Sequence, residues 1–324
     1  MARLVVAVLR GGTSDEYTLS LRTGAQLLRA LPEEEYDVRD ILIDAQGVWH
    51  SRGLPLPPAR ALTGVDAVLN GLHGGIGEDG TLARLLRQLS VAHATASAHA
   101  SALSLHKARA SAVMREAGIH VPRGVLFSVS NEVPSTTMAR AVFEQFGPPY
   151  IVKPTSTGAS HGVVYVASYP ELPEAIARVL ETYGAALVEE YIIGEETTAA
   201  VMDDFRGEEL YAFPPARVVR PERARHLAHT HHLDGAIRYN TPSDFSHAEK
   251  EAIVEAARKA HRALGLSFVS RADIILSRRG PYVLEVNAVP GLYEGAALPP
   301  MLESVGSSVG EYARHQLQLA RERN

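Results

Sequence analysis

The chain has 324 residues, too many for one compact core, and this length predicts two or three domains. Its composition, 46% hydrophobic and 21% charged, is that of an ordinary globular protein. The net charge of −5 argues against a nucleic-acid partner, and the absence of cysteine excludes disulfides and thiolate metal sites. The apolar run before Arg10 is too short for a membrane span and lacks a signal-peptide cleavage region. We therefore expect a cytoplasmic protein with no membrane partner.

Strand and helix patterns alternate over the first hundred residues. Apolar runs predict strands, and amphipathic patterns predict helices, in the order Leu4–Leu9 (strand), Leu19–Ala30 (helix), Val38–Ile43 (strand), Ala67–Asn70 (strand) and Thr81–Leu89 (helix). This order predicts a parallel sheet with ligand loops at the strand ends. The small-residue stretch Ala94–Ser104 is interpreted as a linker.

The rest of the chain continues in the same mixed pattern. The expected helices are Leu105–Ala117, Met138–Phe146, Glu171–Tyr183, His247–Leu264 and Val309–Arg321. The expected strands are Val125–Val129, Tyr150–Lys153, Val163–Val166, Ala186–Glu190, Thr197–Met202 and Leu210–Phe213. Pro214–Asp244 is a long irregular segment, and a loop of this length inside a compact domain is typical of a lid or a binding loop.

A β-hairpin is predicted near the end, with strands Ser270–Leu276 and Tyr282–Asn287 joined by the turn Ser277–Gly280. Glu285 and Asn287 are two residues apart, so they point to the same face of their strand. Asp273 on the partner strand can join them there. Two carboxylates and an amide oxygen form a ligand set suited to Mg²⁺. An exposed hairpin with a polar wet face is the alternative.

Three further segments could form a nucleotide site together with the hairpin. The loop Lys153–Gly162 is rich in small residues, and it could cover phosphates with backbone N–H groups while its lysine supplies charge. The strand Val188–Glu196 could present its backbone to adenine and Glu196 to ribose. The Gly-rich turn Asn70–Thr81 could bind an anion at a helix N-terminus. Each is also compatible with an ordinary turn or strand end.

The order of these motifs resembles the D-alanine–D-alanine ligase family of the ATP-grasp superfamily. The stretches that carry the resemblance are Gly11–Ser14 with Glu16 and Leu19–Leu21, His73–Gly74 with Gly77–Leu82, Ser101–Ser104 with Lys107, Lys153–Pro154, and Glu285–Asn287 with Pro290–Gly291. The resemblance implies a mixed α/β, ATP-grasp fold in three domains. These are a Rossmann-like substrate domain at 1–97, a central subdomain at 98–186, and a C-terminal subdomain with the metal site at 187–324.

The resemblance also implies a role for individual residues. It assigns the ATP-binding role to Lys107, Lys153, Gly158, Ser160, Glu189, Glu190, Tyr191, Ile192, Glu196 and Leu284. It assigns two Mg²⁺ ions, with Mn²⁺ as a substitute, to Asp273, Glu285 and Asn287. It implies D-alanine as the substrate, bound by Glu16 and His73, and an acyl-phosphate intermediate. Arg271 and the N–H of Gly291 match groups at the oxyanion of the tetrahedral intermediate. It further suggests a homodimer.

The departures from the family lie at the substrate end. Ala159 replaces the first serine that usually follows the loop glycine, and His231 and His232 replace a Lys-Tyr pair on the long loop. Ala297 falls where a serine usually holds the carboxylate of the second substrate. In this reading His231 and His232 belong to a lid over ATP.

Three functions are compatible with these residues. The chain could still make D-Ala-D-Ala for peptidoglycan synthesis, with a lid histidine as the phosphate partner. It could ligate a different second substrate, namely another amine or a hydroxy acid. It could be a non-catalytic nucleotide-binding relative, although the lysines, the metal ligands and Arg271 argue against this. Separately, the cluster His226, His229, His231 and His232 could bind zinc.

Overall fold

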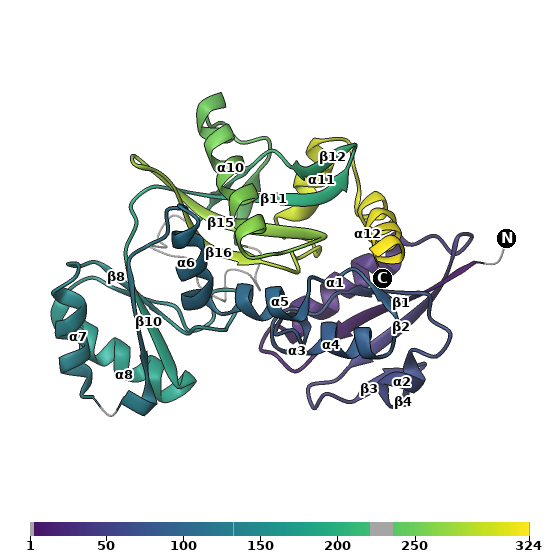
Figure 1. The fold of residues 1–324 in the computed structure, drawn as a ribbon, viewed down its shortest axis with the longest axis horizontal. Helices are drawn as coiled ribbons and strands as arrows, with labels where there is room; N and C mark the ends of the chain where they lie inside the picture. Colours follow the sequence, from purple (N-terminus) through teal and green to yellow (C-terminus); the bar gives the residue numbers. More distant parts are fainter. Residues whose placement is uncertain (1–2, 132, 221–235, 324) are drawn as a thin grey trace.

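The computed structural model describes residues 3–131, 133–220 and 236–323 (Figure 1). Within these ranges the strands form three β-sheets with helices packed against them, so the predicted mixed α/β class is confirmed. None of the helices in the described ranges has the length and apolar character needed to cross a bilayer.

The first sheet has the strand order β4-β3-β2-β1-β5-β6 and is parallel except at one edge. Its strands are β1 (Leu4–Gly11), β2 (Tyr36–Ile43), β3 (Trp49–Ser51), β4 (Leu54–Pro55), β5 (Ala67–Asn70) and β6 (Ala92–His93). Its helices are α1 (Tyr17–Ala30), α2 (Pro58–Ala61), α3 (Gly75–Glu78) and α4 (Thr81–Gln88). β1 pairs in parallel with both β2 and β5, whereas β3 and β4 form an antiparallel edge. The predicted N-terminal parallel sheet is therefore present.

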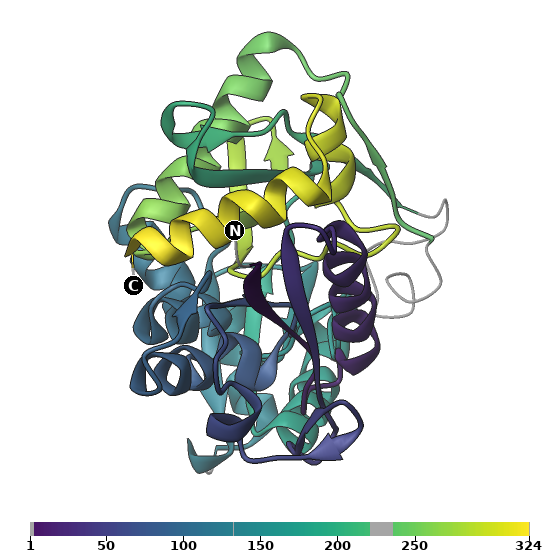
Figure 2. The same cartoon turned by 90° about the vertical axis from the view of Figure 1, so that its right-hand side faces the viewer.

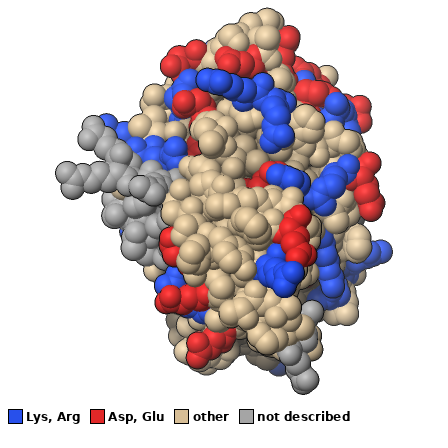
Figure 3. All heavy atoms as spheres, turned by 90° about the vertical axis from the view of Figure 1, so that its left-hand side faces the viewer, with Lys and Arg blue, Asp and Glu red and all other residues tan. Residues whose placement is uncertain are grey.

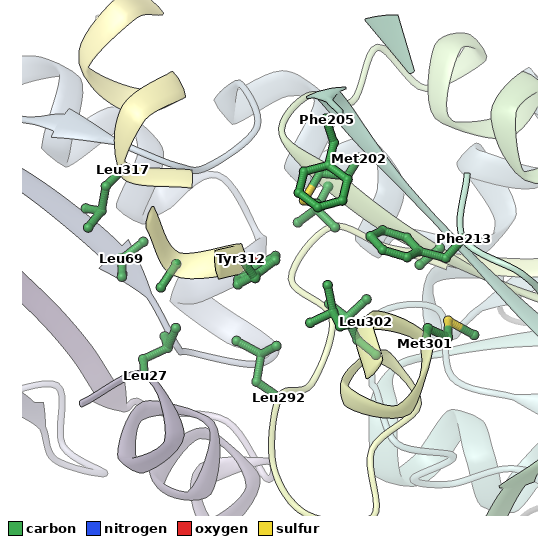
Figure 4. Close-up of a cluster of buried hydrophobic side chains, with 14 of the residues drawn as sticks. Leu27, Leu69, Met202, Phe205, Phe213, Leu292, Met301, Leu302, Tyr312 and Leu317 are labelled. Atoms are coloured by element: carbon green, nitrogen blue, oxygen red, sulfur yellow. The ribbon is translucent and has the colours of Figure 1, made fainter. Parts of the chain in front are cut away.

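The central strand β1 is buried on both faces, as expected of a parallel strand covered by helices. Because side chains alternate along a strand, Val6 and Val8 face one core while Ala7 and Leu9 face the other. The first of these cores extends to the C-terminal helix α12 (Val309–Arg323), and Figure 4 shows it as one cluster running from Leu27 to Phe213. The first sheet and the C-terminal part of the chain are thus joined through a shared hydrophobic core.

The stretch interpreted as a linker is mostly helical. Helix α5 (Ala98–Leu105) begins at Ser97, whose side chain accepts a hydrogen bond from the Ala100 N–H. A bend at His106, which has an extended conformation, separates α5 from helix α6 (Lys107–Glu116). Alanine has the highest helix propensity, and several alanines of this stretch lie in α5. The helix was not predicted from the sequence, and the position of the linker stays a prediction.

The second sheet has the order β7-β10-β8-β9, and all its pairings are antiparallel. Its elements are β7 (Gly124–Ser128), η1 (Val129–Asn131), α7 (Ser135–Phe143), β8 (Tyr150–Lys153), β9 (Val164–Val166), η2 (Tyr169–Glu171), α8 (Leu172–Tyr183) and β10 (Ala185–Glu190). Helices α7 and α8 cover one face through a core that includes Tyr150, Ile176 and Val188. Figure 3, which views this end of the molecule, shows basic and acidic side chains interspersed rather than gathered into a basic stripe.

The third sheet is antiparallel, with the order β14-β13-β11-β15-β16 and with β12 paired to β11. Its elements are β11 (Glu195–Phe205), β12 (Glu208–Ala212), β13 (Ala216–Val219), β14 (Arg238–Asn240), α10 (His247–Ala263), β15 (Val269–Ser277), β16 (Gly280–Asn287) and α11 (Leu298–Ser304). Helix α10 packs on one face of the sheet, and α11 and α12 lie toward the first sheet, as Figures 1 and 2 show.

The segment predicted to be wholly irregular, Pro214–Asp244, contains two strands. β13 and β14 pair with each other, and β13 pairs with β11. Both strands are short, and polar residues interrupt their apolar residues, so the sequence shows no apolar run there. Residues 221–235 lie outside the described ranges, so His231 and His232, together with His226 and His229, do too. The lid and the zinc alternative remain predictions.

Candidate active site

The predicted hairpin is formed by β15 and β16, and its register brings the proposed metal ligands together. Asp273 lies opposite Glu285, and Arg271 lies opposite Asn287. The Asn287 amide nitrogen is 3.3 Å from an Asp273 carboxylate oxygen. The other Asp273 oxygen accepts a hydrogen bond of 2.8 Å from Thr198 on β11. The three oxygen-bearing side chains therefore converge at one end of the hairpin, as their spacing predicted.

All three sheets contribute to one cleft. Its volume is about 1410 Å³, including the part that is open to solvent. The predicted site residues that line it are Glu16, His73, Lys107, Lys153, Ser160, Glu189, Glu190, Tyr191, Ile192, Glu196, Arg271, Asp273, Leu284, Glu285, Asn287 and Gly291. Gly158 lines a small adjoining hollow together with Lys107 and Glu285. Residues from positions 16 to 291 are thus brought to one place.

At one end of the cleft, buried lysines lie against carboxylates. The Lys153 ammonium is 2.7 Å from Glu189, and the two residues stand on the neighbouring strands β8 and β10. The Lys107 ammonium is 2.9 Å from Glu285 and also donates to the Thr157 carbonyl at 2.6 Å. Burial alone would raise the pKa of Glu285, but the two lysines outweigh burial and lower it. Both lysines point into a cleft where phosphates could replace their present partners.

The same end contains an apolar cluster and a carboxylate with an unsatisfied oxygen. Ile192, Ile275 and Tyr282 are buried together, with Leu284 packed against them. Glu196 is 3.3 Å from Arg220, and burial raises its pKa despite this cation. Its buried Oε2 has no hydrogen-bond partner within the described part of the chain. An apolar slot beside such an acceptor suits a flat heterocycle attached to a group that carries hydroxyls.

The loop that joins β8 to β9 connects the two ends of the cleft. Its Thr155 carbonyl accepts from the Lys107 N–H at 2.8 Å, and Ala159 and Ser160 both have positive φ. A Cβ at Gly158 would overlap the Glu16 carboxylate, so a larger residue would displace that side chain. Gly158 thus belongs to the contact between this loop and Glu16.

Two buried glutamates lie at the other end. Glu16 immediately precedes α1, and burial, followed by repulsion from Glu78, raises its pKa to about 8. Glu78 accepts hydrogen bonds from Gly74 N–H at 2.6 Å and from Val289 N–H at 3.2 Å, so it joins the turn after β5 to the segment after β16. Glu78 was not predicted as a site residue, although it lies in a quoted motif. An ammonium group bound beside these carboxyl groups would favour their ionised forms.

His73 lies beside these carboxylates and is neutral near pH 7. Burial, and then the positive charge of Arg271, lower its pKa to about 4. Its Nε2 is 2.7 Å from the Thr23 hydroxyl, and its backbone N–H donates to Ser20 at 2.9 Å. These contacts hold the imidazole edge-on to the Tyr293 ring, with centroids 6.2 Å apart.

Arg271 is buried and forms a two-point ion pair with Asp273 at 2.9 and 2.8 Å. Burial opposes its charge, but Asp273 more than compensates and raises its pKa, so it is a permanent cation. Arg271 lies close to Tyr239 and Tyr293. Its positive charge lowers the pKa of each tyrosine, although burial has the larger effect and raises both. Neither tyrosine was predicted, because their place in the cleft depends on how separate loops pack.

The positions of the two altered alanines differ. Ala159 packs against a small cluster of Leu19, Tyr293 and Ala296 beside the cleft. Ala297, in contrast, is fully buried in the core shared by the first and third sheets. A side chain at 297 therefore faces the core, and Ala296 is the neighbour that contacts the cleft-lining Tyr293.

Comparisons with known proteins agree with this geometry. The family model described as "D-ala D-ala ligase C-terminus" matches residues 113–314. A D-alanine--D-alanine ligase of Methylorubrum populi (strain ATCC BAA-705 / NCIMB 13946 / BJ001) is 34% identical over 324 residues, covering 97% of each chain.

Two solved structures share the fold. The VanG D-Ala:D-Ser ligase from Enterococcus faecalis has a TM-score of 0.83 at 24% identity and covers 98% of this chain and 100% of its own. The D-alanine--D-alanine ligase from Bacillus anthracis complexed with ATP has a TM-score of 0.80 at 22% identity, covering 99% and 100%. The fold, the family model and the full-length relative agree: this chain belongs to the D-alanine–D-alanine ligase family of ATP-grasp enzymes.

Proposed function

We propose that this protein is an ATP-dependent ligase that joins two D-alanines through an acyl phosphate, and so supplies a peptidoglycan precursor. The supporting observation is one cleft in which an end with two buried lysines and an apolar slot continues into a pocket that contains Glu16, His73, Arg271 and Gly291. Phosphoryl transfer requires positioned charges more than covalent chemistry, and these residues provide such charges.

At the nucleotide end we assign ATP binding to the residues predicted for it. Lys107 and Lys153 would leave Glu285 and Glu189 for the phosphates, which need compact point charges. The apolar cluster of Ile192 and Leu284 would contact adenine, and the free Oε2 of Glu196 would accept from ribose. The remaining residues of this assignment are Gly158, Ser160, Glu189, Glu190 and Tyr191.

The hairpin oxygens fit a magnesium site. Asp273, Glu285 and Asn287 offer two carboxylates and an amide oxygen at one end of β15 and β16, a hard-oxygen set that Mg²⁺ or Mn²⁺ prefers. When bound, the ions neutralise charge on the transferring phosphoryl group. Lys107, which contacts Glu285, can then contact phosphate instead.

At the amino-acid end, ionised Glu16 would hold the ammonium of the first D-alanine. The carboxylate of that substrate attacks the γ-phosphate and releases ADP, and the amine of the second D-alanine then attacks the acyl carbon and expels phosphate. Arg271 and the Gly291 N–H would stabilise the oxyanion formed in the second step, where fixed donors are most effective. Neutral His73 cannot repel the ammonium and borders the same pocket.

A second candidate is a ligase with a different second substrate. Ala159 places a methyl group where the family resemblance expects a hydroxyl, and this methyl belongs to an apolar cluster at the amino-acid end. A solved relative of the same fold is a D-Ala:D-Ser ligase. Without this hydroxyl the pocket has one hydrogen-bond partner fewer, so its preference among substrates that carry hydroxyl groups should differ.

Phosphate release from ATP and Mg²⁺ with a panel of D- and L-amino acids and D-hydroxy acids tests both candidates. Release with D-alanine alone, with D-alanyl-D-alanine as the product, would support the first. Release that requires another second substrate would replace it with the second. No release with any member of the panel would exclude both.

The remaining assignments are part of this proposal. We propose three domains at 1–97, 98–186 and 187–324, a cytoplasmic location and a homodimer. Sedimentation of the purified chain would test the homodimer, and a monomer at micromolar concentration would contradict it. Limited proteolysis would test the domain limits, because cleavage concentrates in exposed segments between domains.

A further inference from the structure

Tyr293 lies where loops from all three sheets meet. Its ring packs with Leu19 of α1, Ala159 of the β8–β9 loop and Ala296, and it meets His73 edge-on at an interplanar angle of 82°. Only 9% of the residue is exposed. The ring is therefore held from several sides and forms a fixed wall of the cleft, which Tyr293 lines.

This wall lies next to the proposed position of the reacting carbon. A Cβ added to Gly291 would be 2.7 Å from Tyr293 Cε1, so the ring occupies the space directly over that glycine. If Gly291 and Arg271 hold the oxyanion, the ring borders the point at which the second substrate approaches. Ala159 and Ala296, both with small side chains, pack with the ring at this place.

The hydroxyl of Tyr293 is available to a ligand. No hydrogen bond to it occurs within residues 3–131, 133–220 and 236–323. Burial raises its pKa, so it stays protonated and can donate. The charges that act on it are those of Arg271 and Arg22, which are basic, and of Glu16 and Asp273, which are acidic.

We propose that Tyr293 binds the second amino acid, with its ring bounding the side-chain pocket and its hydroxyl donating to the substrate carboxylate. The carboxylate is the polar group that the second amino acid retains once its amine reacts. Among the charges that act on Tyr293 that of Arg271 is the strongest, and it favours an anion beside the ring. Ala297 is buried in the core and offers no hydroxyl for this purpose. The inference rests on the proposed function, because it assumes that two amino acids meet in this cleft.

Tyr293→Phe keeps the ring and removes only the hydroxyl. We expect KM for the second amino acid to rise by about 10- to 100-fold, the range for a lost hydrogen bond to a charged group. We expect kcat and KM for ATP to change by less than about threefold, since the hydroxyl contacts neither ATP nor the oxyanion. In calorimetry with ADP and Mg²⁺ present, D-alanyl-D-alanine should bind more weakly by the same factor.

Tyr312→Phe is the matched control, because Tyr312 is buried in the core between the first and third sheets and outside the cleft. It should leave KM and dipeptide affinity unchanged, and thermal melting of both variants separates folding from binding.

Dipeptide affinity and second-substrate KM equal to wild type in Tyr293→Phe would overturn the inference, even with an active enzyme. If the wild type releases no phosphate but its dipeptide binding still depends on the hydroxyl, the proposed function fails and the inference holds. Wild-type protein that binds no dipeptide refutes the inference.

Discussion

The two ends of the cleft are built from different kinds of structure. At the nucleotide end, Lys153 and Glu189 stand on neighbouring strands, and Asp273 and Glu285 face each other across a hairpin. At the amino-acid end, the side chains come from the beginnings of helices and from loops after strands, as with Glu16, His73 and Tyr293. Strand pairing fixes the direction of side chains, whereas loops can change contacts without altering a sheet. Ala159, which stands where the family resemblance expects a serine, lies on such a loop at the amino-acid end of the cleft.

The charges at the two ends differ as well. Each buried lysine at the nucleotide end rests on a carboxylate, so that end is electrically balanced without a ligand. At the amino-acid end Glu16 and Glu78 lie close together, and the pKa of each is raised, with burial as the largest cause. A phosphate must therefore exchange partners with existing ion pairs, whereas an ammonium would relieve an existing repulsion. Substitutions on each side can test this difference.

Arg271→Met should have the largest effect on turnover and should separate the two ends most clearly. It removes the cation beside the proposed oxyanion, so kcat should fall by about 10²- to 10³-fold. ATP affinity, measured by calorimetry, should change far less. Arg258→Met, which breaks an ion pair with Glu208 away from the cleft, is the control. A kcat within tenfold of wild type would exclude Arg271 from the reacting centre.

Lys153→Gln tests the nucleotide end. It should weaken ATP binding by about 10- to 100-fold through the loss of a charged contact. It should also lower the free energy of unfolding by about 3 kcal/mol, because Glu189 would remain buried without its cation. The double variant Lys153→Gln/Glu189→Gln should recover most of the stability but not the ATP affinity. Recovery of both would show that Lys153 acts only as a structural partner.

The pH dependence of amino-acid binding tests the opposite end. Glu16 must be ionised to hold an ammonium, and with a free pKa of about 8 it is mostly protonated at neutral pH. KM for the first amino acid should therefore fall as pH rises towards 8, by up to about tenfold per unit. KM for ATP should not follow this trend. Glu16→Gln should bind the amino acid weakly at every pH, and a variant with the wild-type pH profile would assign the titration to another group.

The difference between the ends also explains what could be predicted from sequence. The strands β5 and β8 were predicted with the bounds that the structure shows, and the hairpin was predicted to within one residue at its first strand and two at its second. Alternation along strands was enough to place Glu285 and Asn287 on one face. The short strands β3, β4, β6, β13 and β14 were not predicted, because none of them contains the run of three apolar residues that marks β5, β8 and β9.

Of the cleft-lining residues that were not predicted, some line the apolar slot of the nucleotide end, such as Ile151 and Ile275, and others lie at the amino-acid end or beside Arg271. Tyr293 follows Gly291 by two residues in a stretch without period, and only the packing of Leu19 and Ala159 shows that it faces the cleft. Glu78 belonged to a recognised motif, but its hydrogen bond to Val289, 211 residues away, could not be inferred from local spacing. Residues whose place depends on contacts among distant loops leave no local pattern in the sequence.

The smallest effect on KM is expected for substitutions at a surface contact that connects the two ends of the cleft. Asp15, next to Glu16, is 3.1 Å from His161 of the β8–β9 loop, and the exposed fractions of these two side chains are 67% and 35%. Asp15→Asn should change KM for the first amino acid by at most about threefold, because exposed ion pairs contribute little and salt screens them. His161→Gln should change this KM equally little. If Asp15 and His161 act as a pair, the double variant should have the same KM as either single variant. A change above tenfold would mean that this loop transmits the position of the phosphates to Glu16, and the two ends could then no longer be treated as independent.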